Sequence, residues 1–76
     1  MKSLMIKLDT INDVKNFVNT VSRYDFDVDL ISGRYAVDAK SIMGIFSLDL
    51  SKEIELQIHA DNADQFLSEI QQFIVE

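Results

Sequence analysis

Two stretches in which apolar and polar residues strictly alternate constrain the fold of this chain more than any other feature. They are DFDVDL, residues 25–30, and EIELQIH, residues 53–59. A period of two places the apolar side chains on one face of a β-strand and the charged ones on the other. The chain must therefore build a sheet that is covered on one face and faces water on the other.

Two further strands complete the predicted sheet. Residues 4–8 alternate in the same way, and residues 35–39 follow the turn signal Ser32-Gly33, which predicts a hairpin. Apolar residues at helical spacing predict a first helix over residues 11–22 and a last helix over residues 63–74.

A short third helix is predicted to begin at Ser41, so the element order is βαββαβα. This order predicts a single α+β domain over residues 1–76, with a four-stranded antiparallel sheet and three helices on one face. The ferredoxin-like fold has nearly the same order, and the pattern does not choose between the possible strand orders.

Helix-capping residues support two of these boundaries. Thr10 followed by Asp13 forms a capping box at the start of the first helix. Asp61-Asn62 is placed to cap the last helix.

Composition and charge restrict the class of protein. The chain has no cysteine, so it must fold by packing alone, and its formal net charge of -6 disfavours nucleic acid as a partner. No apolar run reaches the roughly 20 residues that span a bilayer, and the start, MKSLMIKL, is too short and too charged for a signal peptide. We expect a cytoplasmic protein whose partners have basic or apolar surfaces.

Neither the acidic triplet nor the one histidine predicts a metal, cofactor or catalytic site. Asp25, Asp27 and Asp29 have the spacing of a calcium loop, but the glycine and glutamate that an EF-hand needs further on are missing. His59 continues the polar side of a strand, with no companion base or ligand in its pattern. We expect no enzyme activity from these residues.

The stretch AKSIMGIFSL, residues 39–48, is apolar on nearly every side of its short helix. Such a helix can bury only one side against a sheet, so we expect an exposed contact surface on the other, although packing on both sides is the alternative. Ser41 is placed as the N-cap, at an end where backbone N–H groups also favour a phosphate.

Three segments carry a resemblance to a known family. KSIMGIFSL, residues 40–48, resembles the regulatory-serine segment of HPr, the phosphocarrier of the bacterial sugar phosphotransferase system. SRYDFDVDL at 22–30 and EIELQIHADNAD at 53–64 are similar to flanking segments of the same family. The resemblance implies an HPr-like open-faced β-sandwich.

The phosphocarrier segment of the family, G-I-H-A-R-P-A, matches poorly. In the corresponding stretch, Thr10 stands at the position of the carrier histidine, Asn12 at that of the arginine and Asp13 at that of the proline. A hydroxyl is no substitute for imidazole without a base beside it, and Asp13 adds negative charge. His59, on a predicted strand, cannot replace the lost group. We therefore expect no catalytic residue and no carrier reaction.

The resemblance implies a regulatory role like that of the histidine-less, Crh-like variants. Ser41 matches the serine that an HPr kinase/phosphorylase modifies before a LacI-type regulator binds. A partner-binding patch is implied for Lys40, Ile42, Met43, Phe46 and Ser47, with Phe46 where methionine is usual.

Four alternatives stay open at the level of sequence. They are a scaffold with one constant partner, contacts with other phosphotransferase components, a working sugar phosphocarrier, and a weak homodimer in place of a monomer. Glu53 and Asn62 stand where the family often has glycine, and of the two only asparagine readily tolerates left-handed geometry.

Overall fold

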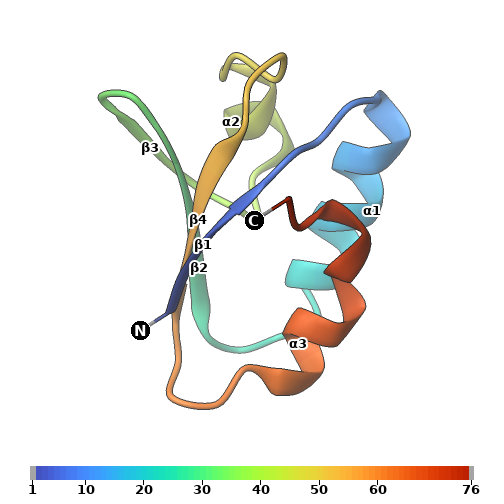
Figure 1. The fold of residues 1–76 in the computed structure, drawn as a ribbon, viewed down its shortest axis with the longest axis vertical. Coiled ribbons are helices and arrows are strands. Elements are labelled where there is room, and N and C mark those ends of the chain that lie inside the picture. The colour runs from blue at the N-terminus through green and yellow to red at the C-terminus, as the bar shows by residue number, and fades with distance from the viewer. Residues whose placement is uncertain (1, 76) are drawn as a thin grey trace.

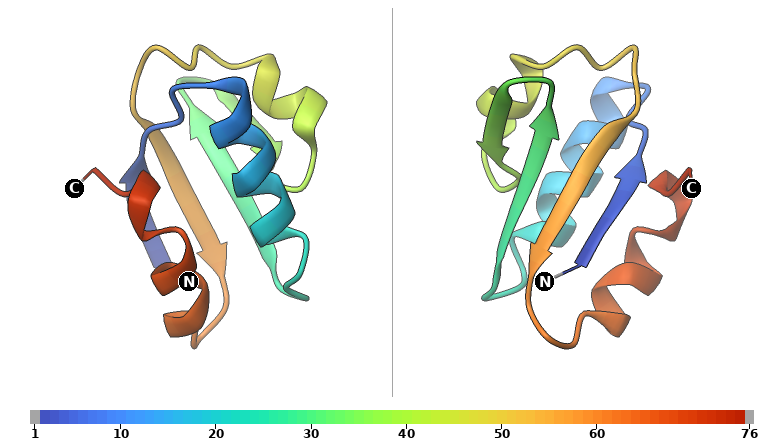
Figure 2. Two further views of the ribbon diagram at one scale, coloured as in Figure 1. Left: turned by 90° about the vertical axis from the view of Figure 1, so that its right-hand side faces the viewer. Right: turned by 60° about the vertical axis from the view of Figure 1, so that its left-hand side comes forward.

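A computed structural model describes residues 2–75 and confirms the predicted element order. The structure consists of one sheet with three helices on one of its faces (Figures 1 and 2). The elements are β1 (Lys2–Ile6), α1 (Ile11–Val21), β2 (Asp27–Ser32), β3 (Tyr35–Asp38), α2 (Ile42–Phe46), β4 (Ile54–His59) and α3 (Asp64–Glu69), followed by a 3-10 turn, Gln71–Phe73.

The sheet has the strand order β1-β4-β2-β3, with every neighbouring pair antiparallel. Leu56 of β4 is opposite both Leu4 of β1 and Leu30 of β2. Neighbouring strands therefore direct their apolar side chains to the same face of the sheet. On that face the side chains lie beneath the helices. The α+β open-faced sandwich is confirmed, and the structure supplies the strand order that the sequence pattern left open.

The hydrophobic core lies between the sheet and the helices. Phe17 of α1, Ile45 of α2 and Phe66 of α3 are fully buried against it. The apolar residues of the strands fill the other side of the core, namely Ile6, Val28, Leu30, Ile54, Leu56 and Ile58. Burial of this apolar surface is the main stabilising contribution in a chain without disulfides.

The β2–β3 hairpin closes through a glycine turn. Ser32 and Tyr35 are paired, and Gly33 between them has a φ of +60°. A positive φ at the first central position is the geometry that suits the twist of a two-residue hairpin. No other residue within 2–75 has a positive φ, so the turns at Glu53 and Asn62 need no glycine.

The first and last predicted elements differ from those observed. The strand predicted over residues 4–8 is Lys2–Ile6, because the Lys7 N–H donates to the Phe73 carbonyl (2.9 Å) and Leu8 turns into the core. The last helix ends at Glu69, not near residue 74. Ile70 and Phe73 are both buried, and the tighter 3-10 turn suits their spacing of three.

The cap of the last helix is also displaced. Its N-cap is Ala63, which offers no side-chain hydrogen bond. The predicted capping residue Asn62 still contributes, since its Oδ1 accepts from the Asp64 N–H at 3.2 Å. The strand predicted over residues 25–30 is likewise shifted, to Asp27–Ser32.

The C-terminal segment covers the outer edge of β1. The Val75 N–H donates to the Met5 carbonyl (3.1 Å), and Ile74 forms a bridge with Ile6. With the bond between Lys7 and Phe73, these contacts satisfy backbone groups that an edge strand otherwise leaves open.

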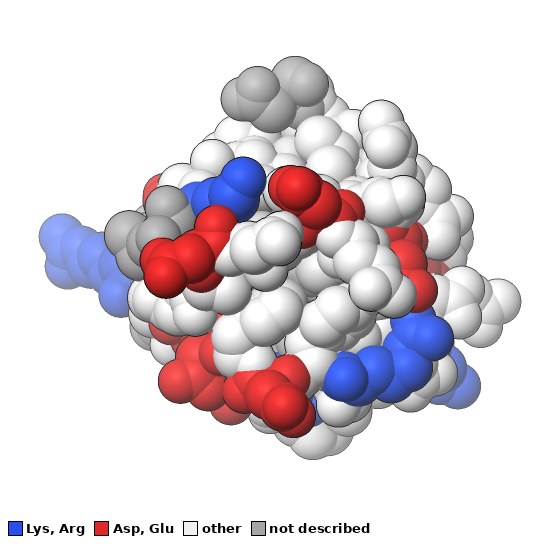
Figure 3. Space-filling view, turned by 90° about the horizontal axis from the view of Figure 1, so that it is seen from below, with Lys and Arg blue, Asp and Glu red and all other residues white. Residues whose placement is uncertain are grey.

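On the face shown in Figure 3, the charged side chains do not form a surface suited to binding nucleic acid. Viewed from the end at which β4 turns into α3, acidic groups are spread around the surface, and the basic ones lie in separate groups. Phosphate binding needs clustered Lys and Arg. Within residues 2–75, no helix has the length and apolarity required to cross a membrane.

Candidate functional site

Ser41 caps α2, as its place in the sequence predicts. It has an extended backbone, and its Oγ accepts a hydrogen bond from the Gly44 N–H at 3.1 Å. Its own N–H donates to the Asp38 carbonyl (2.9 Å), which fixes the start of the helix to the end of β3. The Ser41 side chain is exposed. A hydroxyl is therefore held at the surface, at the N-terminal end of a helix.

The helix after Ser41 has one buried side and one exposed side. Ile45 is fully buried, whereas Met43 is 77% exposed and Phe46 41% exposed. Ile42 lies between these extremes. Packing on both sides, the alternative reading of this stretch, does not occur within residues 2–75, and the exposed side chains of Met43 and Phe46 are available for contact.

Gly44 allows α2 to lie against β3. A Cβ atom at this position would stand 3.2 Å from the Ser41 Oγ and 3.3 Å from the Val37 Cβ. Both contacts are tighter than ordinary van der Waals separations. The glycine thus admits both the cap and the close approach of the strand.

Lys40 and Ser47, both predicted to belong to the contact patch, are engaged within the protein. The Lys40 ammonium donates to the Tyr24 carbonyl at 2.9 Å, and its N–H donates to Asp38 Oδ1 at 2.8 Å. Ser47 follows α2, and its Oγ donates to the Gly44 carbonyl at 2.6 Å. Lys40 thus ties the helix to the segment after α1, which the sequence pattern did not indicate.

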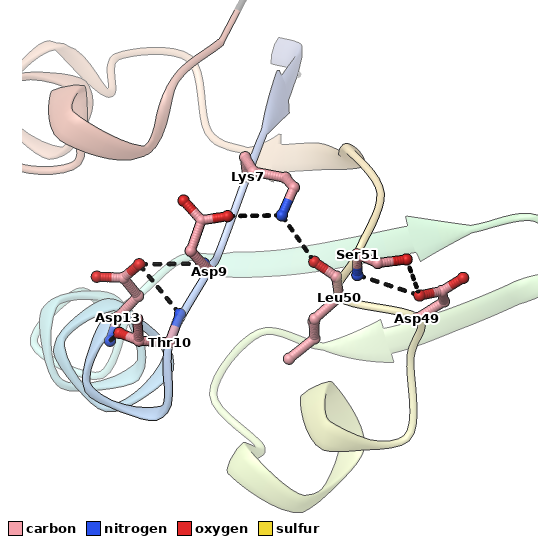
Figure 4. A network of polar contacts seen from close by, with 7 residues as sticks. All are labelled: Lys7, Asp9, Thr10, Asp13, Asp49, Leu50 and Ser51. Carbon is pink, nitrogen blue, oxygen red and sulfur yellow. Dashed lines mark hydrogen bonds and ion pairs between the residues drawn. The ribbon is translucent and has the colours of Figure 1, made fainter.

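The start of α1 is closed by the protein's own carboxylate. The capping box is confirmed: Thr10 Oγ1 accepts from the Asp13 N–H (3.0 Å), and Asp13 Oδ2 accepts from the Thr10 N–H (3.3 Å). The same oxygen accepts from the Asp9 N–H at 3.0 Å (Figure 4). The N–H groups of Asp9 and Thr10 are thus bound by a negative group, which disfavours a second anion beside them. Asn12 is exposed and is not among the residues that these hydrogen bonds join.

Lys7 links this end of α1 to the loop between α2 and β4. Its ammonium donates to Asp9 Oδ1 at 2.7 Å and to the Leu50 carbonyl at 2.9 Å (Figure 4). In the same loop, Asp49 Oδ1 accepts from the Ser51 hydroxyl (2.6 Å) and N–H (3.1 Å). These two bonds hold the pKa of Asp49 below its ordinary value.

The structure places His59 far from Thr10 along β1. His59 is the last residue of β4, and its neighbour Ile58 is opposite Lys2, the first residue of β1. Thr10 lies beyond Ile6, the last residue of β1. The His59 Nε2 lies 2.9 Å from Asp29 Oδ2 of β2. The histidine is thus paired with a carboxylate on the sheet and is not brought to the start of α1.

Two exposed apolar residues were missed. Ile11 is 62% exposed at the first position of α1, although its helical spacing predicts burial. Tyr35 is 71% exposed at the first position of β3, beside the hairpin turn. Both stand at the terminus of an element, where periodicity alone does not tell whether a neighbouring element covers the side chain.

Replacing Thr10 by alanine is expected to lower the free energy of unfolding by about 1 kcal/mol, because the capping hydrogen bond to the Asp13 N–H is lost. Urea denaturation measures the change. Thr20→Ala, within α1, is the control, since its hydroxyl bonds only to the Asn16 carbonyl inside the helix. An equal loss in both variants would contradict the role of the cap.

Stability is expected to fall on acidification below about pH 4.3. Hydrogen bonds from Gln57 and Ser3 lower the pKa of Glu55, as those from Ser51 lower that of Asp49. The unfolded chain then binds more protons, so this stabilisation is present above the unfolded pKa and is lost as pH falls through the folded one. Thermal unfolding between pH 6 and 3 should show a shallower dependence for Glu55→Gln/Asp49→Asn. An unchanged slope would refute the assignment.

Comparisons with known proteins agree with this architecture. The family profile described as "PTS HPr component phosphorylation site" matches residues 13–76. HPr-C-His from Thermoanaerobacter tengcongensis has a similar crystal structure, with a TM-score of 0.80 and 26% identity over 97% of this chain and 91% of that one.

Two further solved structures are similar. Phosphocarrier HPr from Bacillus anthracis has a TM-score of 0.71 and 23% identity, over 97% of this chain and 94% of its own. Crh from Bacillus subtilis has a TM-score of 0.66 and 25% identity, over 93% and 88%, and its structure is described as a domain-swapped dimer. At 23% identity the Bacillus anthracis protein shows the fold alone.

Proposed function

The chain belongs to the HPr family of the bacterial phosphotransferase system, and from this premise we propose that it is a single HPr-like domain without the carrier step. It acts by protein–protein contacts through α2. Members of the family carry phosphoryl groups and are not themselves catalysts.

The observation that carries the loss of the carrier step is the closed start of α1. The chain has one histidine, His59, which lies on β4 and faces Asp29. The position that the family resemblance assigns to the carrier histidine is Thr10, whose hydroxyl caps α1 by accepting from the Asp13 N–H. Without a base beside it, a hydroxyl is a poor acceptor, and the Asp13 carboxylate repels a phosphoryl donor.

The regulatory part of the proposal rests on Ser41 and the apolar residues beside it. A phosphate on Ser41 adds roughly -1.5 to -2 charges next to Met43 and Phe46. The helix dipole favours this charge by only about 0.3–1 kcal/mol, so the fold stays as it is. The change acts on recognition, because the modified surface attracts a partner that presents arginine and repels an acidic one.

The partners that fit this scheme are proteins of the cytoplasm. An HPr kinase/phosphorylase would modify Ser41, and a LacI-type regulator or another phosphotransferase component would bind the result. We propose no direct contact with nucleic acid or membrane.

Phosphorylation of Ser41 is tested with an HPr kinase and ATP. We expect one phosphate, which mass spectrometry of peptides places on Ser41, and no incorporation in Ser41→Ala. Ser47→Ala is the matched control, since Ser47 is an exposed serine at the other end of the same helix. Absence of label under conditions that modify an ordinary HPr would refute regulation by this route.

A constant scaffold is the second candidate, because the Ser41 hydroxyl already has a structural role as the acceptor for the Gly44 N–H. In that case Ser41→Ala lowers stability by about 1 kcal/mol and leaves partner binding unchanged. Ser41→Asp separates the candidates further, since only a regulated surface responds to the added charge.

The proposed oligomeric state also rests on membership of the HPr family. We propose a monomer or a weak homodimer, the latter because the similar Crh protein is described as a dimer. Light scattering over a range of protein concentrations distinguishes the two.

A further inference from the structure

The open face of the sheet, opposite the helices, has a row across the four strands in which three residues are apolar and the fourth is Glu55. Glu55 of β4 is directly opposite Met5 of β1 and Ile31 of β2, and Ile31 is opposite Ala36 of β3. Met5 and Ile31 are only half-buried. A sheet face that merely contacts water is expected to be polar, so these apolar side chains need another explanation.

The next two rows of this face carry three carboxylates beside Ser3, Gln57 and His59. Asp29 of β2 is directly opposite Asp38 of β3, and Asp27 is opposite His59. Like charges directly opposite each other destabilise a sheet. Including Glu55, four carboxylates lie on this face, and none of the lysine or arginine side chains of the four described strands does so.

A hollow brings the two properties together. It has a volume of about 400 Å³ and is lined by Met5 and Ile31 and by Asp49, Lys52, Glu53 and Glu55. Glu55 is held in place by Ser3 Oγ at 2.7 Å and by Gln57 Nε2 at 3.0 Å. The apolar side chains of Met5 and Ile31 thus lie beside three carboxylates, Asp49, Glu53 and Glu55, and one lysine, Lys52.

We propose that the open face is a second docking surface, which binds a basic protein segment in which lysine or arginine alternates with aliphatic residues. The aliphatic part of a basic side chain fits over Met5 and Ile31 while its charged end reaches Glu55. Charge complementarity selects this partner, since the chain carries a net charge of -6.

The open face is independent of the surface around Ser41. All three helices cover the other side of the sheet (Figure 2), so a partner on the open face does not compete with one on α2. Two partners could therefore be held by one copy of the protein, whether or not Ser41 is modified.

A capped octapeptide of alternating lysine and valine serves as the probe, followed by amide chemical shifts of the labelled protein. We expect saturable shifts at Met5, Asp29, Ile31 and Glu55, with the amides of α2 unchanged. The same peptide with glutamate in place of lysine should give none. Shifts centred on α2, or scattered without saturation, would overturn the proposal.

Charge reversal on the two faces provides the matched comparison. We expect Asp29→Lys/Glu55→Lys to weaken peptide binding by at least about tenfold, and Asp64→Lys/Glu69→Lys on α3 to change it by less than about twofold. Circular dichroism and the unchanged amide shifts of α2 confirm that both variants are folded. Equal weakening by the two pairs would show non-specific attraction to net charge and overturn the docking site. If the reversed open face does not fold, Asp29→Asn/Glu55→Gln replaces it, with weaker binding expected and unchanged binding again contradicting the site.

Discussion

The protein is expected to accept no phosphoryl group from enzyme I under conditions that fully label an HPr with its histidine. Within residues 2–75, no base is hydrogen-bonded to the Thr10 hydroxyl, and Asp13 places a carboxylate against the Asp9 and Thr10 N–H groups at the start of α1. Labelled phosphoenolpyruvate, enzyme I and an acid-lability assay measure the transfer. The appearance of an acid-labile phosphate would refute the proposed loss of the carrier step.

The same reasoning predicts how transfer can be restored. Thr10→His/Asn12→Arg/Asp13→Pro introduces the histidine, arginine and proline of the family's segment into α1. Proline is tolerated in the first turn, because no intrahelical bond of its N–H is lost there. We expect measurable acid-labile phosphate in this variant. Thr10→His alone, which keeps the repelling Asp13, should be labelled more slowly, and an equal rate in both would show that Asp13 is no barrier.

Phe66→Ala is expected to have the largest effect on stability. Phe66 is fully buried, with its ring edge-on to Tyr24 and Phe26 at centroid distances of 5.2 and 5.6 Å. Removing a buried phenylalanine costs about 3–5 kcal/mol through lost burial and the cavity that remains. A domain of this size has a free energy of unfolding of about 4–11 kcal/mol, so a large part of it is lost.

Urea denaturation followed by circular dichroism measures this loss. Tyr35→Ala is the control, because Tyr35 is 71% exposed and its removal should change stability by less than about 0.5 kcal/mol. A loss below about 1.5 kcal/mol in Phe66→Ala would mean that the aromatic cluster collapses around the missing ring or was never closely packed.

The strands could be predicted because their alternation is a local property of the chain. The apolar residues of 54–58 are all buried in β4, as predicted. Strand order is not local, because β4 lies between β1 and β2 in the sheet. Along the chain, α1 and α2 separate β4 from β1, and β3 and α2 separate it from β2. The predicted end of the last helix was wrong for the same reason. The position of Phe73 depends on contacts with the segment around β1 and with α1.

In the candidate site, too, the contacts between residues close in the sequence could be predicted, and those between distant residues could not. The caps of Ser41 and Thr10 involve residues three positions apart, and both could be predicted from the sequence. The Lys40 bond to the Tyr24 carbonyl and the Lys7 bond to the Leu50 carbonyl join residues 16 and 43 positions apart. No periodicity encodes such contacts, because they depend on how the loops are brought together by the fold.

The C-terminal segment along β1 has a consequence for how copies of this chain can meet. An exchange of β1 between two copies requires that the bonds from Lys7 and Val75 open first, because the segment already occupies the outer edge of the strand. On the opposite edge, β3 has only four residues, and its Asp38 carbonyl is taken by Ser41. We expect these contacts to oppose edge-to-edge growth into larger aggregates.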